Sequence, residues 1–209
     1  MIPIRDTIPS QRVAWVTRAL VLANVVVFLI EWTRGPGLEA LLYRFGVVPT
    51  HWMVGVPGDL LAWPRLALTL LTSQFLHGGI MHVASNMLYL WIFADNVEDR
   101  LGHARFLLLY LGSGVAAALT QLLLSPRSAL PMVGASGAIA GVLGAYLLAF
   151  PGAKIVTFVP LGWFLQTMEL PALCSSASGS CCNGGAGCRR LDRWRTSAAS
   201  RSVRTWGGS

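Results

Sequence analysis

Five stretches of the chain are apolar over about the length that a helix needs to cross a bilayer. A spanning helix takes roughly 20 residues with few charges, and this pattern predicts helices at 13–31, 80–95, 104–124, 130–150 and 155–173. The last is the weakest. None of the runs alternates as the strand of a membrane barrel does, and bilayer hydrocarbon satisfies no backbone polar group. The pattern therefore predicts an all-α fold, a polytopic membrane helical bundle.

Composition supports this prediction and excludes an ordinary soluble domain. Hydrophobic residues make up 54% of the chain and charged residues 12%, whereas the charged share of soluble domains is near a quarter. The first apolar run follows Arg5, Arg12 and Arg18 as a signal peptide would, but no small-residue cleavage pattern follows Glu31. We therefore interpret the run as a retained first span.

The distribution of basic residues mildly favours a cytoplasmic N-terminus. Inner segments would then carry Arg5, Arg12, Arg18, Arg100, Arg105 and Lys154, against Arg34, Arg44, Arg65 and Arg127 outside. We expect an integral protein of a bacterial inner (plasma) membrane. Between the first two helices, a connection of about 45 residues contains several prolines and tryptophans, which favours an interfacial loop with short amphipathic pieces.

The character of the chain changes at Cys174, so we divide it into a membrane domain at 1–173 and a tail at 174–209. The tail holds all four cysteines and six arginines. The cysteines show no paired Cys-x-x-Cys spacing and no nearby histidine, which argues against a metal site. A basic tail that contacts anionic lipid or nucleic acid remains open, but we favour translation out of frame. In either case this composition predicts disorder.

Ser136 is the only strongly polar side chain in the apolar run 130–150. Such a hydroxyl is costly at membrane depth unless it is hydrogen-bonded or functional. Gly137 and Gly141 lie four residues apart, as in helices that pack closely, so a packing role for the serine is a real alternative. Upstream, His82 and Asn86 also lie four apart and share one helical face, which shifts the balance toward catalysis.

Three blocks in this order resemble the rhomboid family of intramembrane serine proteases. They are the segment 76–86, Leu-His-Gly-Gly-Ile-Met-His-Val-Ala-Ser-Asn, the segment Glu-Asp-Arg-Leu-Gly at 98–102, and Gly-Ala-Ser-Gly at 134–137. A lone Gly-x-Ser-Gly is weak, but matched order and spacing make the resemblance specific. It covers residues 13–173 and implies a rhomboid-like bundle with about five spans, the sixth of the family missing.

The resemblance implies cleavage of transmembrane protein substrates within the lipid bilayer by a serine-histidine dyad. Ser136 would be the nucleophile, and the oxyanion donors would be Asn86, the Ser136 backbone N–H and His82. We expect the remaining motif residues to be structural, and Glu98 and Arg100 to tether a cytoplasmic loop: His77, Gly78, Glu98, Arg100, Gly134, Gly137 and Gly141. No cofactor, metal or nucleic acid is expected.

One departure from the family bears on activity. Rhomboids take their general base from a histidine in a sixth helix, and no histidine follows His103. Of the others, His82 is assigned to the oxyanion, whereas His51, His77 and His103 fall in expected loops. A serine without a base is a poor nucleophile, so we expect no measurable cleavage by this chain. It is then either a truncated or frameshifted protease, or a non-catalytic relative that binds transmembrane clients.

Overall fold

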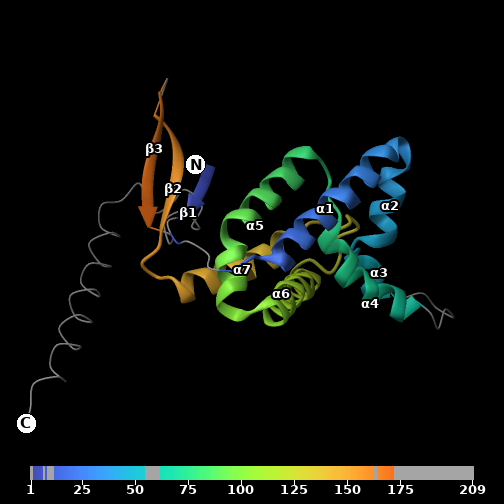
Figure 1. Ribbon diagram of the computed structural model, residues 1–209. Helices are drawn as coiled ribbons and strands as arrows, with labels where there is room; N and C mark the ends of the chain where they lie inside the picture. Colours follow the sequence, from blue (N-terminus) through green and yellow to red (C-terminus); the bar gives the residue numbers. More distant parts are fainter. Residues whose placement is uncertain (1, 7, 9–11, 55–61, 162–163, 172–209) are drawn as a thin grey trace, which may run out of the picture.

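The computed structural model describes residues 2–6, 8, 12–54, 62–161 and 164–171 (Figure 1). Four long helices dominate it: α1 at Trp15–Thr33, α5 at Ile80–Leu101, α6 at His103–Leu124 and α7 at Ser136–Ala149. They correspond to the first four predicted windows, so the prediction of a helical bundle is confirmed. Within the described residues, α1 and α6 are long and apolar enough to cross a membrane, and α7 is a shorter apolar helix.

The connection between α1 and α5 consists of short helices. In chain order these are η1 at Gly35–Gly37, α2 at Leu38–Phe45, α3 at Pro49–Val54, α4 at Ala62–Thr72 and η2 at Ser73–Phe75. Helix α2 packs against α4 and α1, and α4 packs against α6. The predicted loop with short helical pieces is therefore folded back onto the bundle.

The predicted fifth helix is wrong. Strand β2 at Lys154–Leu161 and strand β3 at Phe164–Pro171 form an antiparallel pair, and β1 at Ile2–Asp6 joins the other edge of β2. The sequence of β2 explains this, because Ile155, Val156, Thr157 and Val159 are β-branched and favour strands, whereas Pro160 would break a helix. The predicted tail at 174–209 lies outside the described residues.

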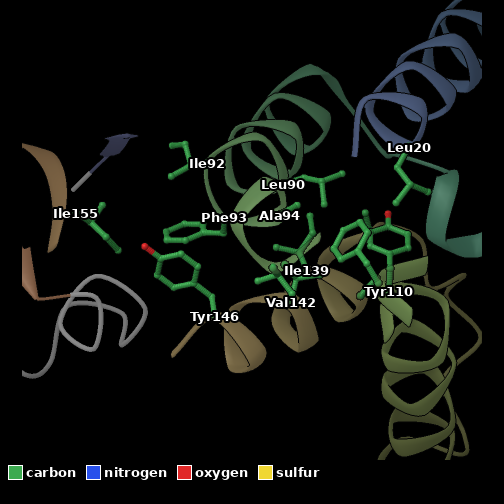
Figure 2. Packing of buried hydrophobic residues seen from close by; sticks show 14 of the residues in the cluster. Leu20, Leu90, Ile92, Phe93, Ala94, Tyr110, Ile139, Val142, Tyr146 and Ile155 are labelled. Carbon is green, nitrogen blue, oxygen red and sulfur yellow. The ribbon is translucent and has the colours of Figure 1, made fainter. Parts of the chain in front are cut away.

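The core lies where α7 packs between α5 and α6 (Figure 2). Phe93 of α5 meets Tyr146 of α7 edge to face, with ring centroids 5.1 Å apart. The buried residues of α7 recur at helical spacing as Ala138, Val142 and Tyr146, which makes one continuous buried stripe. This packing fixes the direction of α7, and with it the place where its first residue lies.

Glycines bring α7 close to α6. A Cβ on Gly137 would overlap Ala117 of α6, and one on Gly141 would overlap Ser113. Small residues at a helix contact allow the two backbones to approach. The N-terminal end of α7 is thereby held close to α6.

Candidate active site

Ser136 is the first residue of α7, and the loop before it is anchored at two points. The Gly134 N–H donates to the Ser73 carbonyl at 2.8 Å. Val47 and Met132 exchange backbone hydrogen bonds of 3.1 and 2.8 Å in an isolated bridge. These bonds hold the loop that precedes Ser136 against η2 and against the segment that follows α2.

The loop turns at Gly134, directly beside the two predicted donors of α5. Gly134 has a φ of 122°, a conformation that glycine adopts readily and other residues rarely do. A Cβ there would lie 2.7 Å from His82 Nε2 and 3.7 Å from Asn86 Nδ2. The structure thus brings His82 and Asn86 against the backbone two residues before Ser136.

Ser136 itself opens onto a cavity of about 200 Å³ between η2, α6 and α7. Its side chain is exposed and makes no hydrogen bond with a described residue. His82 and Asn86 do not line this cavity, and no hydrogen bond joins either of them to the serine among the described residues. The polar residues around the cavity are Ser73, Gln74, Gln121 and Ser136.

The start of α7 supplies electrostatic help that the sequence motifs did not reveal. The first backbone N–H groups of a helix have no partner within it, and the helix dipole places partial positive charge there. No side chain caps α7 at Ala135. An oxyanion formed at Ser136 would therefore face free N–H groups at the positive end of a 14-residue helix.

Asn86 and His77 present unpaired polar atoms on the α5 side. Both side chains are buried, and neither Asn86 Nδ2 nor His77 Nε2 has a hydrogen-bond partner among the described residues. The rings of His77 and His82 meet edge to face with centroids 5.2 Å apart. Burial and the neighbouring His82 lower the pKa of His77 to about 4, so His77 is neutral at neutral pH.

Sequence reasoning missed Glu31 of α1. Its side chain is 1% exposed, and both carboxylate oxygens lie 3.1 Å from the His77 backbone nitrogen, whose N–H donates to them. The signal was available, because an acidic residue at the end of an apolar span is expensive and usually functional. Glu31 fixes the backbone of His77, and the His77 ring packs against His82.

Glu98 lies at the other end of α5, sixteen residues and thus about 24 Å from His82. Its carboxylate accepts hydrogen bonds from the Val16 N–H at 2.9 Å, the Thr17 N–H at 2.8 Å and the Thr17 hydroxyl at 2.7 Å. His103 Nδ1 also contacts it. Glu98 therefore holds the start of α1, at the opposite end of α5 from His82.

The remaining predicted residues lie apart from this centre. Arg100 is exposed at the end of α5, and Gly78 is exposed before α5 with open space around its Cα. Two histidines that we expected in loops lie on helices instead, His51 in α3 and His103 at the start of α6. Neither borders the Ser136 cavity.

Comparison with known proteins identifies the family. The model of the Rhomboid domain matches residues 64–180, more than half of the chain. The chain belongs to the rhomboid family. This family of integral membrane proteins includes intramembrane serine proteases, and the matched residues contain His82, Asn86, Glu98 and Ser136.

Individual relatives agree. The chain is 47% identical over 128 residues to the rhomboid protease GluP of Bacillus subtilis, covering 61% of this chain and 23% of GluP. It is 36% identical over 135 residues to the putative rhomboid protease YdcA of the same species, covering 60% of this chain and 62% of YdcA. It is 38% identical over 96 residues to the mitochondrial rhomboid protein 1 of Saccharomyces cerevisiae, covering 44% of this chain and 28% of that protein.

The chain thus spans between about a quarter and three fifths of the length of these relatives. No solved structure matches it.

Proposed function

We propose that this chain carries the nucleophile and oxyanion side of an intramembrane serine endopeptidase site that accepts transmembrane helices of membrane proteins. The observation that carries the proposal is the Gly134 turn, which packs on His82 and Asn86 and leads directly into Ser136. Family membership supports it, because the relatives GluP and YdcA are named as rhomboid proteases.

In the proposed reaction, Ser136 Oγ attacks the carbonyl carbon of a substrate peptide bond while a base, which imidazole supplies in the assay below, takes the hydroxyl proton and passes it to the leaving amine. Negative charge develops on the carbonyl oxygen, and preset donors lower the barrier by roughly 3 kcal/mol each. The backbone N–H of Ser136 and the unpaired Asn86 Nδ2 are suited to this role, and His82 can donate a third hydrogen bond. Glu31 acts on them indirectly by fixing His77.

The surroundings of the histidines support the further proposal that the 209-residue chain does not cleave measurably. His103 contacts Glu98 at the far end of α5, His51 lies on α3, and buried His77 has Nδ1 3.2 Å from the Phe75 carbonyl. None of them borders the Ser136 cavity. Removal of the general base lowers the turnover number of a well-studied serine protease by a factor on the order of a million.

The same observation favours a second candidate, a non-catalytic rhomboid-like protein that binds transmembrane clients. For either function we propose a bacterial inner membrane with the N-terminus in the cytoplasm. The two relatives from Bacillus subtilis support the bacterial membrane, although mitochondrial relatives also match. The division into a membrane domain at 1–173 and a tail at 174–209 also remains a proposal.

A cleavage assay with a small-molecule base separates the two candidates. The chain and its Ser136→Ala variant are reconstituted in liposomes with a model transmembrane substrate, with and without added imidazole. We expect no product without imidazole, and a slow product with imidazole that the variant does not form. Ser136-dependent product without imidazole would refute the proposed inactivity.

A binding measurement completes the test. Crosslinking of the substrate helix to the chain is compared in the same liposomes. Crosslinking without any Ser136-dependent product, even with imidazole, would overturn the endopeptidase site in favour of the binder. Absence of both would contradict both candidates.

A further inference from the structure

A second cavity lies beside η2 and shares no lining residue with the Ser136 cavity. It has a volume of about 380 Å³ and runs between α1, α2 and the segment from Thr72 to Leu76. We call it the α1–α2 cleft, and its lining includes Val27 and Ile30 of α1, Arg34 directly after α1, and Leu41 and Phe45 of α2. Its volume falls in the range of small-molecule sites.

The cleft follows α1 from membrane depth to the end of the span. Val27, Ile30 and Arg34 follow one another on one face, and the seven helical steps from Val27 to Arg34 rise about 10 Å. Trp32, between them in the chain, is 63% exposed, as befits a tryptophan at the level of the lipid headgroups. The apolar end of the cleft is therefore at acyl-chain depth, and Arg34 is at headgroup depth.

The charges in the cleft are arranged for a ligand with a negative head. The Glu31 carboxylate points at the His77 N–H, and the Thr72 hydroxyl donates to the Phe45 carbonyl at 2.6 Å. Arg34 is exposed at the mouth, and no acidic side chain of the described residues forms a salt bridge with it. A second arginine, Arg44, lies over the Phe45 ring, 5.5 Å from its centroid.

We propose that the α1–α2 cleft binds one acyl chain of an anionic phospholipid, with the lipid phosphate on Arg34. The chain would lie along Val27, Ile30 and Leu41 and be held there by van der Waals contacts with their side chains. The guanidinium would bind the phosphate in a forked hydrogen-bonded pair.

One other occupant fits less well. A free phosphate would leave the apolar walls exposed to water.

Native mass spectrometry of the full chain, released from nanodiscs of mixed phosphatidylglycerol and phosphatidylcholine, tests the proposal. Leu41→Trp fills the cleft, and Arg34→Gln removes the charge at its mouth. Matched controls are Leu123→Trp, at a leucine of α6 that is 79% exposed, and Arg105→Gln, at an exposed arginine of α6. Ile30→Phe is a milder filling variant, at a side chain already 47% exposed, should Leu41→Trp not fold.

We expect the wild type and both controls to retain one phosphatidylglycerol. The filling variants should retain about tenfold less, a change of 1.4 kcal/mol, and Arg34→Gln should lose the preference for phosphatidylglycerol over phosphatidylcholine. Retention unchanged by filling would overturn the acyl-chain site. Equal loss in Arg34→Gln and Arg105→Gln, or displacement of the lipid by inorganic phosphate, would overturn the headgroup contact. None of these readouts depends on cleavage at Ser136.

Discussion

Buried polar groups are hydrogen-bonded at the far end of α5, which contains Glu98, and unpaired at the near end, beside the Ser136 loop. At the far end, Glu98 accepts hydrogen bonds from Val16 and Thr17, and Asn96 donates to Asp6 and to the Ile8 carbonyl. At the near end, Asn86 Nδ2 and His77 Nε2 have no partner among the described residues.

This difference separates stability from chemistry within one helix. Buried polar groups are normally paired, because an unpaired one costs about 1–3 kcal/mol. A helix that satisfies its polar groups at one end and leaves donors free at the other is stabilised by the first and prepared for a ligand by the second. We infer that the far end contributes the stability that the near end gives up, a comparison that four experiments can break or sharpen.

The largest effect should come from Glu98→Ala at the far end. Removal of this carboxylate leaves two backbone N–H groups and the Thr17 hydroxyl without their acceptor, and we expect a loss of about 3 kcal/mol in the free energy of unfolding. Thermal denaturation in detergent measures it. The control is Arg100→Ala, at an exposed arginine of the same helix, because substitutions of exposed side chains usually change stability little. Equal losses of stability in the two variants would show that the buried carboxylate of Glu98 contributes no more than an exposed side chain.

Gly134→Ala should have the next largest effect, now at the near end. The added Cβ meets the His82 ring at 2.7 Å in a backbone conformation that favours glycine, and we expect a cost of about 2 kcal/mol. Gly78→Ala is the matched control, because it has open space and no positive φ. The midpoints of thermal unfolding should therefore fall for Gly134→Ala alone, and an unchanged midpoint would show that the turn does not press on His82.

Acidification should weaken the near end through His77. Because the pKa of His77 is lowered to about 4 from 6.5, the unfolded chain binds more protons between these values, and stability falls as the pH drops through that window. We expect about 1 kcal/mol less stability at pH 5.5 than at pH 7. His77→Gln should remove this dependence, whereas His51→Gln, at an exposed position, should retain it. Identical pH profiles for wild type and His77→Gln would contradict the assignment.

The smallest effect is expected from substitutions of two asparagines of α5. They are also the sharpest test of the comparison. Asn86→Leu removes an unpaired amide and should stabilise by about 0.5 kcal/mol, whereas Asn96→Leu removes a paired one and should destabilise by about 1 kcal/mol. Both side chains are at least 92% buried, so exposure does not distinguish them. Chemical denaturation with one probe measures both, and shifts of the same sign would show that the two ends do not differ.

The helical framework could be predicted from the sequence, and candidate site residues could be proposed from it, because both depend on local patterns. Apolar windows locate α1, α5, α6 and α7, and the spacing of His82 and Asn86 places them on one face of α5. Their approach to the Ser136 loop depended on family resemblance, because no local rule brings residues fifty positions apart together.

What could not be predicted depends on long-range contacts. The bond from Glu31 to the His77 backbone joins residues 46 positions apart, and no spacing rule relates them. The strands β2 and β3 were missed because hydropathy alone does not distinguish an apolar strand pair from an apolar helix. In this segment, the β-branched residues of β2 and Pro160 indicate a strand more clearly than hydropathy does.

The backbone bridge between Val47 and Met132 has a mechanical consequence. Val47 lies two residues after the end of α2, and Met132 lies four residues before Ser136, so two hydrogen bonds couple the loop that leads into the serine to the segment after α2, a helix that packs against α1. A shift of α2 along α1 would therefore move this loop as well. In the proposed endopeptidase, the depth at which Ser136 meets a substrate peptide bond would follow the position of α2.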